Sequence, residues 1–457
     1  MEPTVRIPSA APANVRVPPE LEGLRRLAYN LYWTWHPRAR AVFARIDGAG
    51  WARHHSPIPI LAGMVNWAPL LDNPDFMAEA SRVIRDFDRY LGNGADHWFH
   101  RRHARELDGP IAYFCAEYGI HESLGIYSGG LGVLAGDHMK SASDMAMPLV
   151  GVGLLYRNGY FRQTIDADGH QEHRYVNFDL SRLPLTRVLS REGEPLSVSV
   201  ELPGRDVAVD VWLAQVGRVP VLLLDTDTPA NDPSDRPITH ILYVRGREMR
   251  LHQELILGVG GVRALRALAI APAAWHLNEG HSAFLLAERA RELVAKGATL
   301  DDALSTVSRN SVFSIHTPVS AGNERFEADL VRRVAGPLLD GDGRPNTGGV
   351  PVERVLEIGR GTDDDPGQFD MTAFSLRLTS GANAVSKLHA VTASSTWQGI
   401  APHGIIPITN GVHPPTWSAG LPDPCWMATV GAGPVASPSS ESSRSGEDLT
   451  ATPASSI

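Results

Sequence analysis

The sequence predicts an α/β protein with a mostly parallel sheet, preceded by a small helical domain. Short apolar runs at residues 273–277, 312–315 and 405–408 are bounded by turn residues, as buried strands typically are. Helical patterns lie between these runs, and strands that alternate with helices favour a parallel sheet with helices on both faces. The block before them differs, because its apolar residues recur at helical spacing.

The helical domain is predicted for residues 14–105. Leu21, Leu24 and Leu27 fall at helical spacing, and Phe76 and Phe87 belong to a later repeat of the same pattern. Tryptophan can stack on a sugar ring, but at helical spacing it more often packs in a core. The tryptophans of this block, which we expect in its core, are Trp33, Trp35, Trp51, Trp67 and Trp98.

The stretch from residue 110 to 163 carries the strongest local signal. An apolar run at residues 111–115 leads to Glu117, and a glycine cluster at residues 129–132 precedes a helical pattern at residues 133–146. Such a turn leaves backbone N–H groups free for an anion or for sugar hydroxyls, and a Cβ would block their approach. The spacing matches neither G-x-x-x-x-G-K-S/T nor G-x-G-x-x-G, which argues against ATP and NAD. A turn with only a structural role is the alternative.

The α/β lobe is predicted for residues 106–421, with a β-rich insertion at about residues 160–225. Residues 196–200 and 207–211 alternate apolar and polar side chains across a Pro-Gly turn, which indicates a hairpin. From residue 238 to 269 the pattern indicates a long helical region with glycines in its middle.

Polar residues recur where the predicted strands end. In a parallel sheet these carboxyl ends meet at one edge, where ligands bind, so we expect a shared polar pocket. The alternative is that polar residues occur there by default as the chain leaves the core. The residues concerned are Glu117, Asp225, Asp227, Glu279, His281, His316 and Asn410.

Three other interpretations of these residues are a metal site, a hydrolase and a structural role. His276, Glu279 and His281 lack the H-E-x-x-H spacing of a zinc-binding helix, so we expect no metal site. Glu117 and Glu279 could be the paired carboxylates of a hydrolase. His316 could instead cap a strand or satisfy a buried partner.

Composition and charge argue against several classes of binding partner. The formal net charge is −9 at pH 7 and the sequence pI is about 6.1, which argues against nucleic acid and anionic membranes, because both reward a basic face. Cys115 and Cys425 make neither a disulfide framework nor a metal cluster, and they indicate a reducing, cytoplasmic setting. The sequence shows neither an apolar run long enough to span a membrane nor a secretion signal.

Six motifs in a fixed order resemble the α-glucan phosphorylases, and in particular the short bacterial branch of that family. The resemblance covers about residues 14–417, and the order of the motifs makes it specific. Val133 and residues 415–417 lack the arginines of the long-form enzymes, as in the short branch. The motifs are residues 112–120, 129–132, 152–156, 276–281, 312–317 and 409–412.

The resemblance implies the N-terminal lobe of a two-lobed, GT-B type glycosyltransferase. It implies phosphorolysis of the terminal α-1,4 bond of glycogen or maltodextrin by inorganic phosphate, with retention, to give glucose 1-phosphate. It also implies pyridoxal phosphate as the cofactor, acting through its phosphate group.

The same resemblance assigns roles to residues. His316 is the expected catalytic residue, bonding the glucose and steadying the transition state through its backbone carbonyl. The glycine loop would hold phosphate and glucose by its N–H groups, while Glu279 and His281 would lie near the acceptor sugar. The residues expected to bind glucan or phosphate are Gly129, Gly130, Leu131, Glu117, Asn410, Glu279 and His281.

The predicted α/β lobe ends near residue 421. Residues 422–457 are rich in Ser and Gly, a composition that cannot bury a core and predicts a disordered tail. We therefore expect the second Rossmann-like lobe, with its Schiff-base lysine, to be missing, and this truncated chain to be inactive and to bind no pyridoxal phosphate covalently. The expected partners are α-glucan, inorganic phosphate and a second copy in a homodimer, with no nucleic acid and no membrane.

Two other functions stay open at this point. One is a nucleotide-sugar-dependent, glucan synthase-like glycosyltransferase, because starch synthases of the same two-lobed fold also use a Gly-Gly-Leu loop. The other is a glucan-binding lobe without catalysis. A requirement for a nucleotide sugar distinguishes the first, and release of glucose 1-phosphate distinguishes the second.

Overall fold

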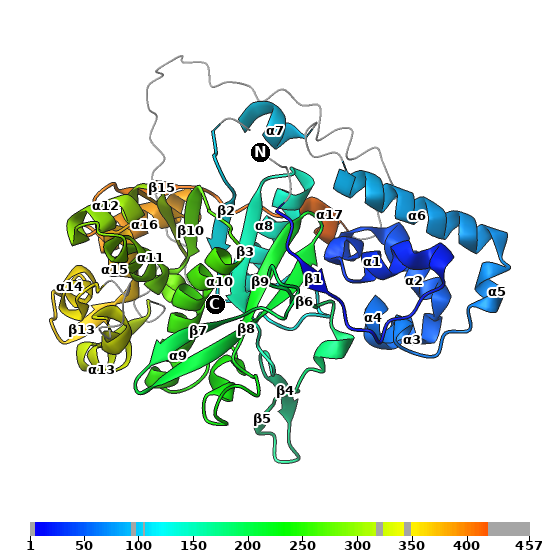
Figure 1. Ribbon diagram of the computed structural model, residues 1–457, viewed down its shortest axis with the longest axis horizontal. Helices are drawn as coiled ribbons and strands as arrows, with labels where there is room; N and C mark the ends of the chain where they lie inside the picture. Colours follow the sequence, from blue (N-terminus) through cyan, green and yellow to red (C-terminus); the bar gives the residue numbers. More distant parts are fainter. Residues whose placement is uncertain (1–4, 93–96, 104–105, 317–322, 342–348, 419–457) are drawn as a thin grey trace, which may run out of the picture. The chain divides into compact units, whose positions relative to one another are not determined.

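The computed structural model describes residues 5–92, 97–103, 106–316, 323–341 and 349–418. In these residues an 11-stranded sheet runs in the order β1-β6-β8-β9-β3-β2-β10-β11-β14-β15, with β7 paired to β8 (Figure 1). The strands are β1 (Ser9–Ala10), β2 (Ile111–Phe114), β3 (Leu149–Leu154), β4 (Arg162–Ile165), β5 (Gln171–Arg174), β6 (Thr186–Val188), β7 (Ser197–Leu202), β8 (Arg205–Val216), β9 (Val219–Asp225), β10 (Ala274–Asn278), β11 (Ser311–Ile315), β12 (Arg325–Glu327), β13 (Gln368–Asp370), β14 (Gly381–Ala384) and β15 (Ile405–Pro407).

The run from β9 to β15 in this order is parallel throughout. Every residue of β3 and β9 is buried, as in parallel strands that are covered on both faces and are therefore apolar along their whole length. This part of the sheet confirms the predicted parallel α/β architecture and its strands, including those expected at residues 111–115, 273–277, 312–315 and 405–408. The carboxyl ends of these strands lie at one edge of the sheet.

The other end of the sheet is antiparallel. The predicted hairpin is confirmed as β7 and β8, with Val200 opposite Val207. β8 also pairs with β9, so most of the region expected as a β-rich insertion continues the main sheet. The β4–β5 hairpin forms a separate two-stranded sheet, as does the pair β12–β13.

Helices connect and cover these strands. In the described residues they are α1 (Glu22–Ala28), α2 (Pro37–Ile46), α3 (Gly48–His54), α4 (Pro57–Leu61), α5 (Ala68–Leu71), α6 (Pro74–Gly92), α7 (Trp98–His103), α8 (Gly130–Asp144), α9 (Arg247–Leu255), α10 (Gly261–Ala267), α11 (Phe284–Ala295), α12 (Leu300–Arg309), α13 (Ala328–Leu339), α14 (Val352–Ile358), α15 (Met371–Arg377), α16 (Lys387–Thr396) and α17 (Pro414–Trp417). The helix α8 packs on β3 and β9, while α16 packs on β14 and β15.

The long helical region expected at residues 238–269 is present but interrupted. A π-helical turn, Ile256–Gly260, separates α9 from α10. A Cβ on Gly258 would lie 2.7 Å from the backbone nitrogen of Leu285, and one on Gly261 would lie 2.5 Å from the ring of Phe114. The glycines therefore let this region pack directly on a neighbouring backbone and on the sheet.

The block before β2 is helical, and its core contains Trp33 and Trp35, both buried. This confirms the core interpretation for these two tryptophans, whereas Trp98 is 44% exposed. The side chain of Asn30 joins the block to the β8–β9 turn by donating to the carbonyl oxygen of Gly217 and accepting from its N–H, both at 2.9 Å.

No helix within the described ranges is long and apolar enough to cross a membrane. The tail predicted for residues 422–457 lies outside the described residues.

Gly136 tests the packing of α8 against the loop that follows β2. A Cβ at this position would lie 2.1 Å from the carbonyl oxygen of Gly119, a backbone atom that cannot move independently. We expect Gly136→Ala to lower the free energy of unfolding by about 2–3 kcal/mol. Gly92→Ala, where a Cβ meets nothing within 4 Å, is the matched control. Urea unfolding monitored by circular dichroism measures both, and equal stabilities would contradict this packing.

Candidate functional site

Glu117 follows β2 and is buried, with 2% of its surface exposed. Its Oε2 accepts hydrogen bonds from the backbone N–H groups of Ser128 and Gly129, at 2.6 and 3.2 Å. Its Oε1 accepts a hydrogen bond from the hydroxyl of Tyr243 at 2.6 Å. A carboxylate is stabilised here because the nearby N-terminus of α8 carries partial positive charge. One side chain thus ties the glycine loop to a distant segment of the chain.

The glycine loop, residues 128–132, is packed on one side and open on the other. A Cβ on Gly132 would lie 2.7 Å from Oε2 of Glu117, which is too close for a carbon atom. Gly129 and Gly130 are both exposed, and a Cβ on either would meet nothing within 4 Å. Because α8 begins at Gly130, the open side coincides with a helix N-terminus, where free N–H groups can bind an anion.

The ends of β10 and β11 bring a second set of polar groups together. Asn278 is buried, its Nδ2 donates to Sγ of Cys115 at 3.1 Å, and its Oδ1 lies 2.5 Å from Nε2 of His316. Oε1 of Glu279 accepts the backbone N–H of His316 at 3.1 Å. Cys115 in turn donates to the carbonyl oxygen of Glu117 at 3.0 Å, so the two sets form one continuous cluster.

Glu279 has an unusual backbone conformation, with φ +72° and ψ 171°. Residues other than glycine rarely adopt this region, at a cost of about 1–3 kcal/mol, and they do so mainly at active sites and ligand clamps. Burial of its side chain and the hydrogen bond from His316 hold Glu279 in place. The strain marks this strand end as a candidate for function.

Burial keeps the histidines of the cluster neutral. It lowers the pKa of His316 to about 4, with a smaller contribution from the charge of His389. The pKa of His281 lies well below its ordinary value, first through burial and then through the charges of Arg250 and His316. Nδ1 of His281 is buried without a hydrogen-bond partner among the described residues, which is unusual for a buried polar atom.

Comparison with known proteins identifies relatives of this chain. A family model described as "Protein of unknown function (DUF3417)" matches residues 17–124. The chain is 41% identical over 434 residues to a glycogen phosphorylase of Mycobacterium tuberculosis. The matched region covers 90% of this chain and 49% of that protein. It is 39% identical over 410 residues to a maltodextrin phosphorylase of Thermococcus litoralis, covering 88% of this chain and 48% of the relative.

This chain is a homologue of the glycogen and maltodextrin phosphorylases. A glycogen phosphorylase of Aquifex aeolicus agrees, at 35% identity over 400 residues that cover 87% of this chain and 56% of the relative. These phosphorylases are glycosyltransferases, so the family is one of enzymes. The chain spans about half the length of the curated relatives it matches.

Most site residues predicted for this phosphorylase homologue lie at the carboxyl ends of β2, β10 and β11. Glu117, Glu279 and His316 belong to the bonded cluster, and the ring of His281 lies 6.3 Å from that of Tyr243. Within the described ranges, the side chain of Asn410 makes no hydrogen bond to this cluster. Its side chain is exposed, and its backbone N–H donates to the carbonyl oxygen of Val385 at 3.0 Å.

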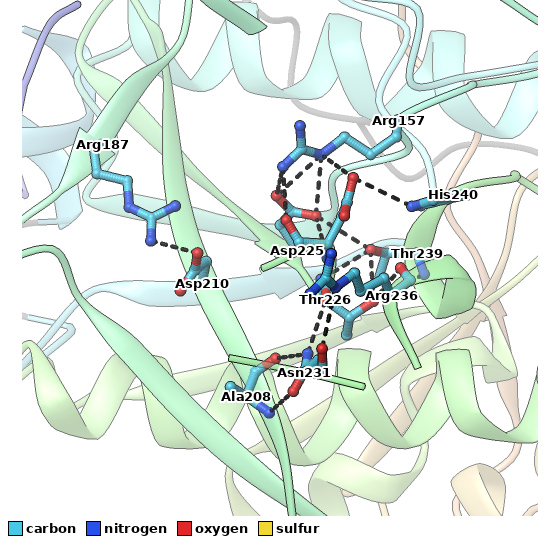
Figure 2. A network of polar contacts seen from close by, with 11 residues as sticks. Arg157, Arg187, Ala208, Asp210, Asp225, Thr226, Asn231, Arg236, Thr239 and His240 are labelled. Carbon is cyan, nitrogen blue, oxygen red and sulfur yellow. Dashed lines mark hydrogen bonds and ion pairs between the residues drawn. The ribbon is translucent and has the colours of Figure 1, made fainter. Parts of the chain in front are cut away.

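Asp225 and Asp227 do not join the pocket expected for them. Figure 2 shows Asp225 engaged elsewhere, with Arg157, which bonds it at 2.6 Å. Asp227 lies 3.8 Å from Nε of Arg157 and 3.4 Å from Nε2 of His240. Asp225 is fully buried, and a buried carboxylate needs such a partner, so tertiary pairing overrides its position at a strand end. The prediction of a shared pocket was wrong for these two residues.

Two polar residues near the cluster were missed. Asn383 lies on β14 opposite Ser314, and its Oδ1 accepts a hydrogen bond from Oγ of Ser314 at 2.7 Å. That Oγ also lies 2.8 Å from Nε2 of His276. The available signal for Asn383 was a polar residue inside the short Gly-Ala-Asn-Ala strand. Tyr243 gave no local signal, because its partner Glu117 is remote in sequence.

The expected absence of a metal site at His276, Glu279 and His281 was based on spacing. Among the described residues, the His, Cys, Asp or Glu side chains close enough to share an ion are those of Asp166, Asp168 and His170, in the turn of the β4–β5 hairpin. Asp168 and His170 are exposed, Asp166 is partly buried, and the group lies outside the cluster.

Covalent attachment of pyridoxal phosphate requires a lysine at the site. The lysines of the sequence are Lys140, Lys296 and Lys387. Lys140 is buried on α8, burial lowers its pKa to about 8, and its Nζ donates to the hydroxyl of Thr416 at 3.1 Å. Lys296 and Lys387 are exposed. The described residues therefore do not fit a covalently held pyridoxal phosphate.

Buried neutral histidines make stability depend on pH. Burial, with smaller contributions from the charges of His138 and His316, lowers the pKa of His276 to about 3. As the pH is lowered, this imidazole is protonated near pH 6.5 in the unfolded chain but stays neutral in the folded chain. We therefore expect the free energy of unfolding to decrease as the pH is lowered from about 6.5 to about 4. The decrease is about 1.4 kcal/mol per pH unit for each such histidine.

The same dependence can be assigned to one residue. His276→Gln should reduce the slope of the free energy of unfolding against pH by about 1.4 kcal/mol per pH unit, which corresponds to one proton. His403→Gln, at an exposed histidine, is the matched control and should leave the slope unchanged. Denaturant unfolding at about pH 7.5, pH 6 and pH 5 measures the slopes. An unchanged slope in the His276 variant would contradict a neutral buried imidazole.

Proposed function

We propose that this chain supplies the glucan- and phosphate-binding lobe for α-glucan phosphorolysis. In this reaction inorganic phosphate attacks C1 of the terminal glucose, the α-1,4 bond from that C1 to the oxygen of the next sugar breaks, and this oxygen leaves with the shortened glucan and takes a proton. The products are glucose 1-phosphate and a glucan shorter by one unit. The observation that carries the proposal is the continuous cluster of Glu117, the glycine loop, Glu279 and His316 in a homologue of glycogen phosphorylases.

The chemistry of the cluster suits these two ligands. The N–H groups of Gly130 and Leu131, in the first turn of α8, would hold the phosphate, because they lie at a helix N-terminus beside exposed glycines. A sugar carries hydroxyls but no charge, and neutral imidazoles such as His281 can exchange hydrogen bonds with hydroxyls without leaving a buried charge unpaired.

His316 would act from the end of β11. Its backbone N–H donates to Glu279 and its ring nitrogen lies 2.5 Å from Oδ1 of Asn278, and these two contacts hold the residue at the strand end. A preorganised carbonyl near C1 of the glucose would stabilise positive charge that develops as the α-1,4 bond breaks. Because Asn278 is buried, removing the ring also costs folding stability, so activity variants at His316 need a measured Tm.

Pyridoxal phosphate, in the phosphorylase family, supplies a phosphate group that acts on the substrate phosphate. No step is assigned to it in this chain, since Lys140, Lys296 and Lys387 do not fit covalent attachment at the cluster. We propose a cytoplasmic setting, where glucan and phosphate are both present.

A direct assay tests the function. The purified chain is incubated with maltoheptaose, inorganic phosphate and pyridoxal phosphate, and glucose 1-phosphate is measured. Its release supports phosphorolysis. Calorimetric binding of maltoheptaose and phosphate without release would instead support a non-catalytic glucan-binding lobe, and glucan extension from ADP-glucose or UDP-glucose would support the synthase alternative. Absence of both binding and release would overturn the proposal.

Gly130→Val separates phosphate binding from folding. A Cβ at Gly130 meets no protein atom within 4 Å, so the fold has room for the side chain, but the added atoms would stand beside the N–H groups that hold the anion. We expect phosphate affinity to fall at least about tenfold, with maltoheptaose affinity changed much less and Tm nearly unchanged.

Gly48→Val is the matched control for this variant. Gly48 is the first residue of α3, and a Cβ there also meets nothing within 4 Å. Calorimetric titrations with inorganic phosphate and maltoheptaose on both variants give the comparison. Equal losses for the two ligands in the Gly130 variant would point to misfolding and not to a phosphate site.

The cofactor expectation has a separate test. Because the described lysines are either exposed or bonded elsewhere, we expect borohydride reduction of the chain with pyridoxal phosphate to leave no cofactor at the site. Mass spectrometry of tryptic peptides measures the modification at each lysine. Stoichiometric labelling of Lys140 would contradict the expectation, whereas sparse labelling of Lys296 or Lys387 reports only their exposure.

A further inference from the structure

Tyr243 lies between β9 and α9 and has a left-handed backbone, with φ +57°. This conformation costs a residue with a side chain about 1–2 kcal/mol, so surrounding contacts must hold it. The preceding residue is fixed to the loop after β3, because the N–H of Leu242 donates to the carbonyl oxygen of Gly159 at 3.1 Å. The guanidinium of Arg250 lies 5.3 Å from the centroid of the tyrosine ring. Tyr243 is therefore held in a defined place.

The hydroxyl of Tyr243 has a single direction in which to donate. It bonds Oε1 of Glu117 at 2.6 Å, and the other oxygen of that carboxylate accepts the N–H groups of Ser128 and Gly129. The pKa of Tyr243 is raised, first by burial of the hydroxyl and then by the charge of Glu117. The hydroxyl therefore remains protonated and acts as a donor at neutral pH.

The ring itself contributes little to the core. Tyr243 is 38% exposed, whereas its hydroxyl reaches a carboxylate that is almost fully buried. A residue that served only to fill space would be placed the other way, with its ring inside and its hydroxyl in water. The position of Glu117 thus depends on the hydroxyl more than on the ring.

We propose that Tyr243 is a positioning residue for the glycine loop. Its hydroxyl holds the Glu117 carboxylate against the N–H groups of Ser128 and Gly129, and this fixes the turn from which α8 starts at Gly130. The ligand that benefits is phosphate, and in this respect the inference rests on the proposed function. The effect on the loop itself does not depend on any ligand.

Tyr243→Phe tests the inference, because it removes only the hydroxyl. Hydrogen exchange of the Ser128 and Gly129 amides, measured on the unliganded full chain by NMR, should become about five- to tenfold faster. Phosphate affinity should fall by a similar factor, while Tm changes little. Tyr160→Phe is the matched control, since Tyr160 is 42% exposed and its hydroxyl makes no hydrogen bond within the described ranges.

A double variant shows whether Tyr243 acts through Glu117. In a Glu117→Gln background, adding Tyr243→Phe should change the exchange of the two amides less than about twofold, because the charged acceptor is already gone. Undiminished effects in both backgrounds would overturn a role through Glu117. Unchanged exchange in Tyr243→Phe would overturn the inference whatever the binding results.

The remaining outcome separates the two proposals. Faster exchange in Tyr243→Phe, together with a wild-type chain that binds no inorganic phosphate, supports the positioning role and counts against the proposed function. Faster exchange with weaker phosphate binding supports both.

Discussion

The carboxylate of Glu117 is the interaction on which the rest of the site depends. It is buried beside the sheet, where an ionised carboxylate without donors would cost several kcal/mol. Two backbone N–H groups, one tyrosine hydroxyl and the N-terminus of α8 supply what it needs. The loop must therefore come close, which explains why Gly132 has no room for a Cβ. Folding thus uses the N–H groups of Ser128 and Gly129, which lie next to those of Gly130 and Leu131 that we propose for phosphate.

The helix that starts at this loop is held at its other end as well. His413, in the segment after β15, is fixed to α8 by two contacts. Its N–H donates to Asp137 at 3.1 Å, and its Nε2 lies 3.0 Å from Asp144. Nδ1 of His413 lies 2.8 Å from the hydroxyl of Thr416, which also accepts from Lys140. Anchoring of α8 near its C-terminal end limits the ways in which the glycine loop can move.

Strand direction explains why the cluster exists at all. The strands β2, β10 and β11 are parallel neighbours, so the residues that follow them emerge at one edge. Buried polar residues then need partners, and Cys115, Asn278 and His316 provide them for one another. The strained backbone of Glu279 fits this arrangement, since strain persists where surrounding contacts hold it and where function uses it.

The sequence by itself determined the elements with strong periodicity. The apolar runs of β2, β10, β11 and β15, the hairpin β7–β8 and the glycine turn before α8 could all be predicted, because their signals are local. The order of six motifs also predicted the similarity to glycogen and maltodextrin phosphorylases that the comparisons show.

Only the tertiary structure decided which polar residues share a site. Asp225 and Asn410 end predicted strands just as Glu117 does, yet Asp225 is neutralised by Arg157 and the side chain of Asn410 is exposed. Conversely, Tyr243 reaches Glu117 from a segment without any motif. The physical reason is that a hydrogen bond or ion pair between residues far apart in sequence depends on where the sheet and helices bring them, and no local pattern records that distance.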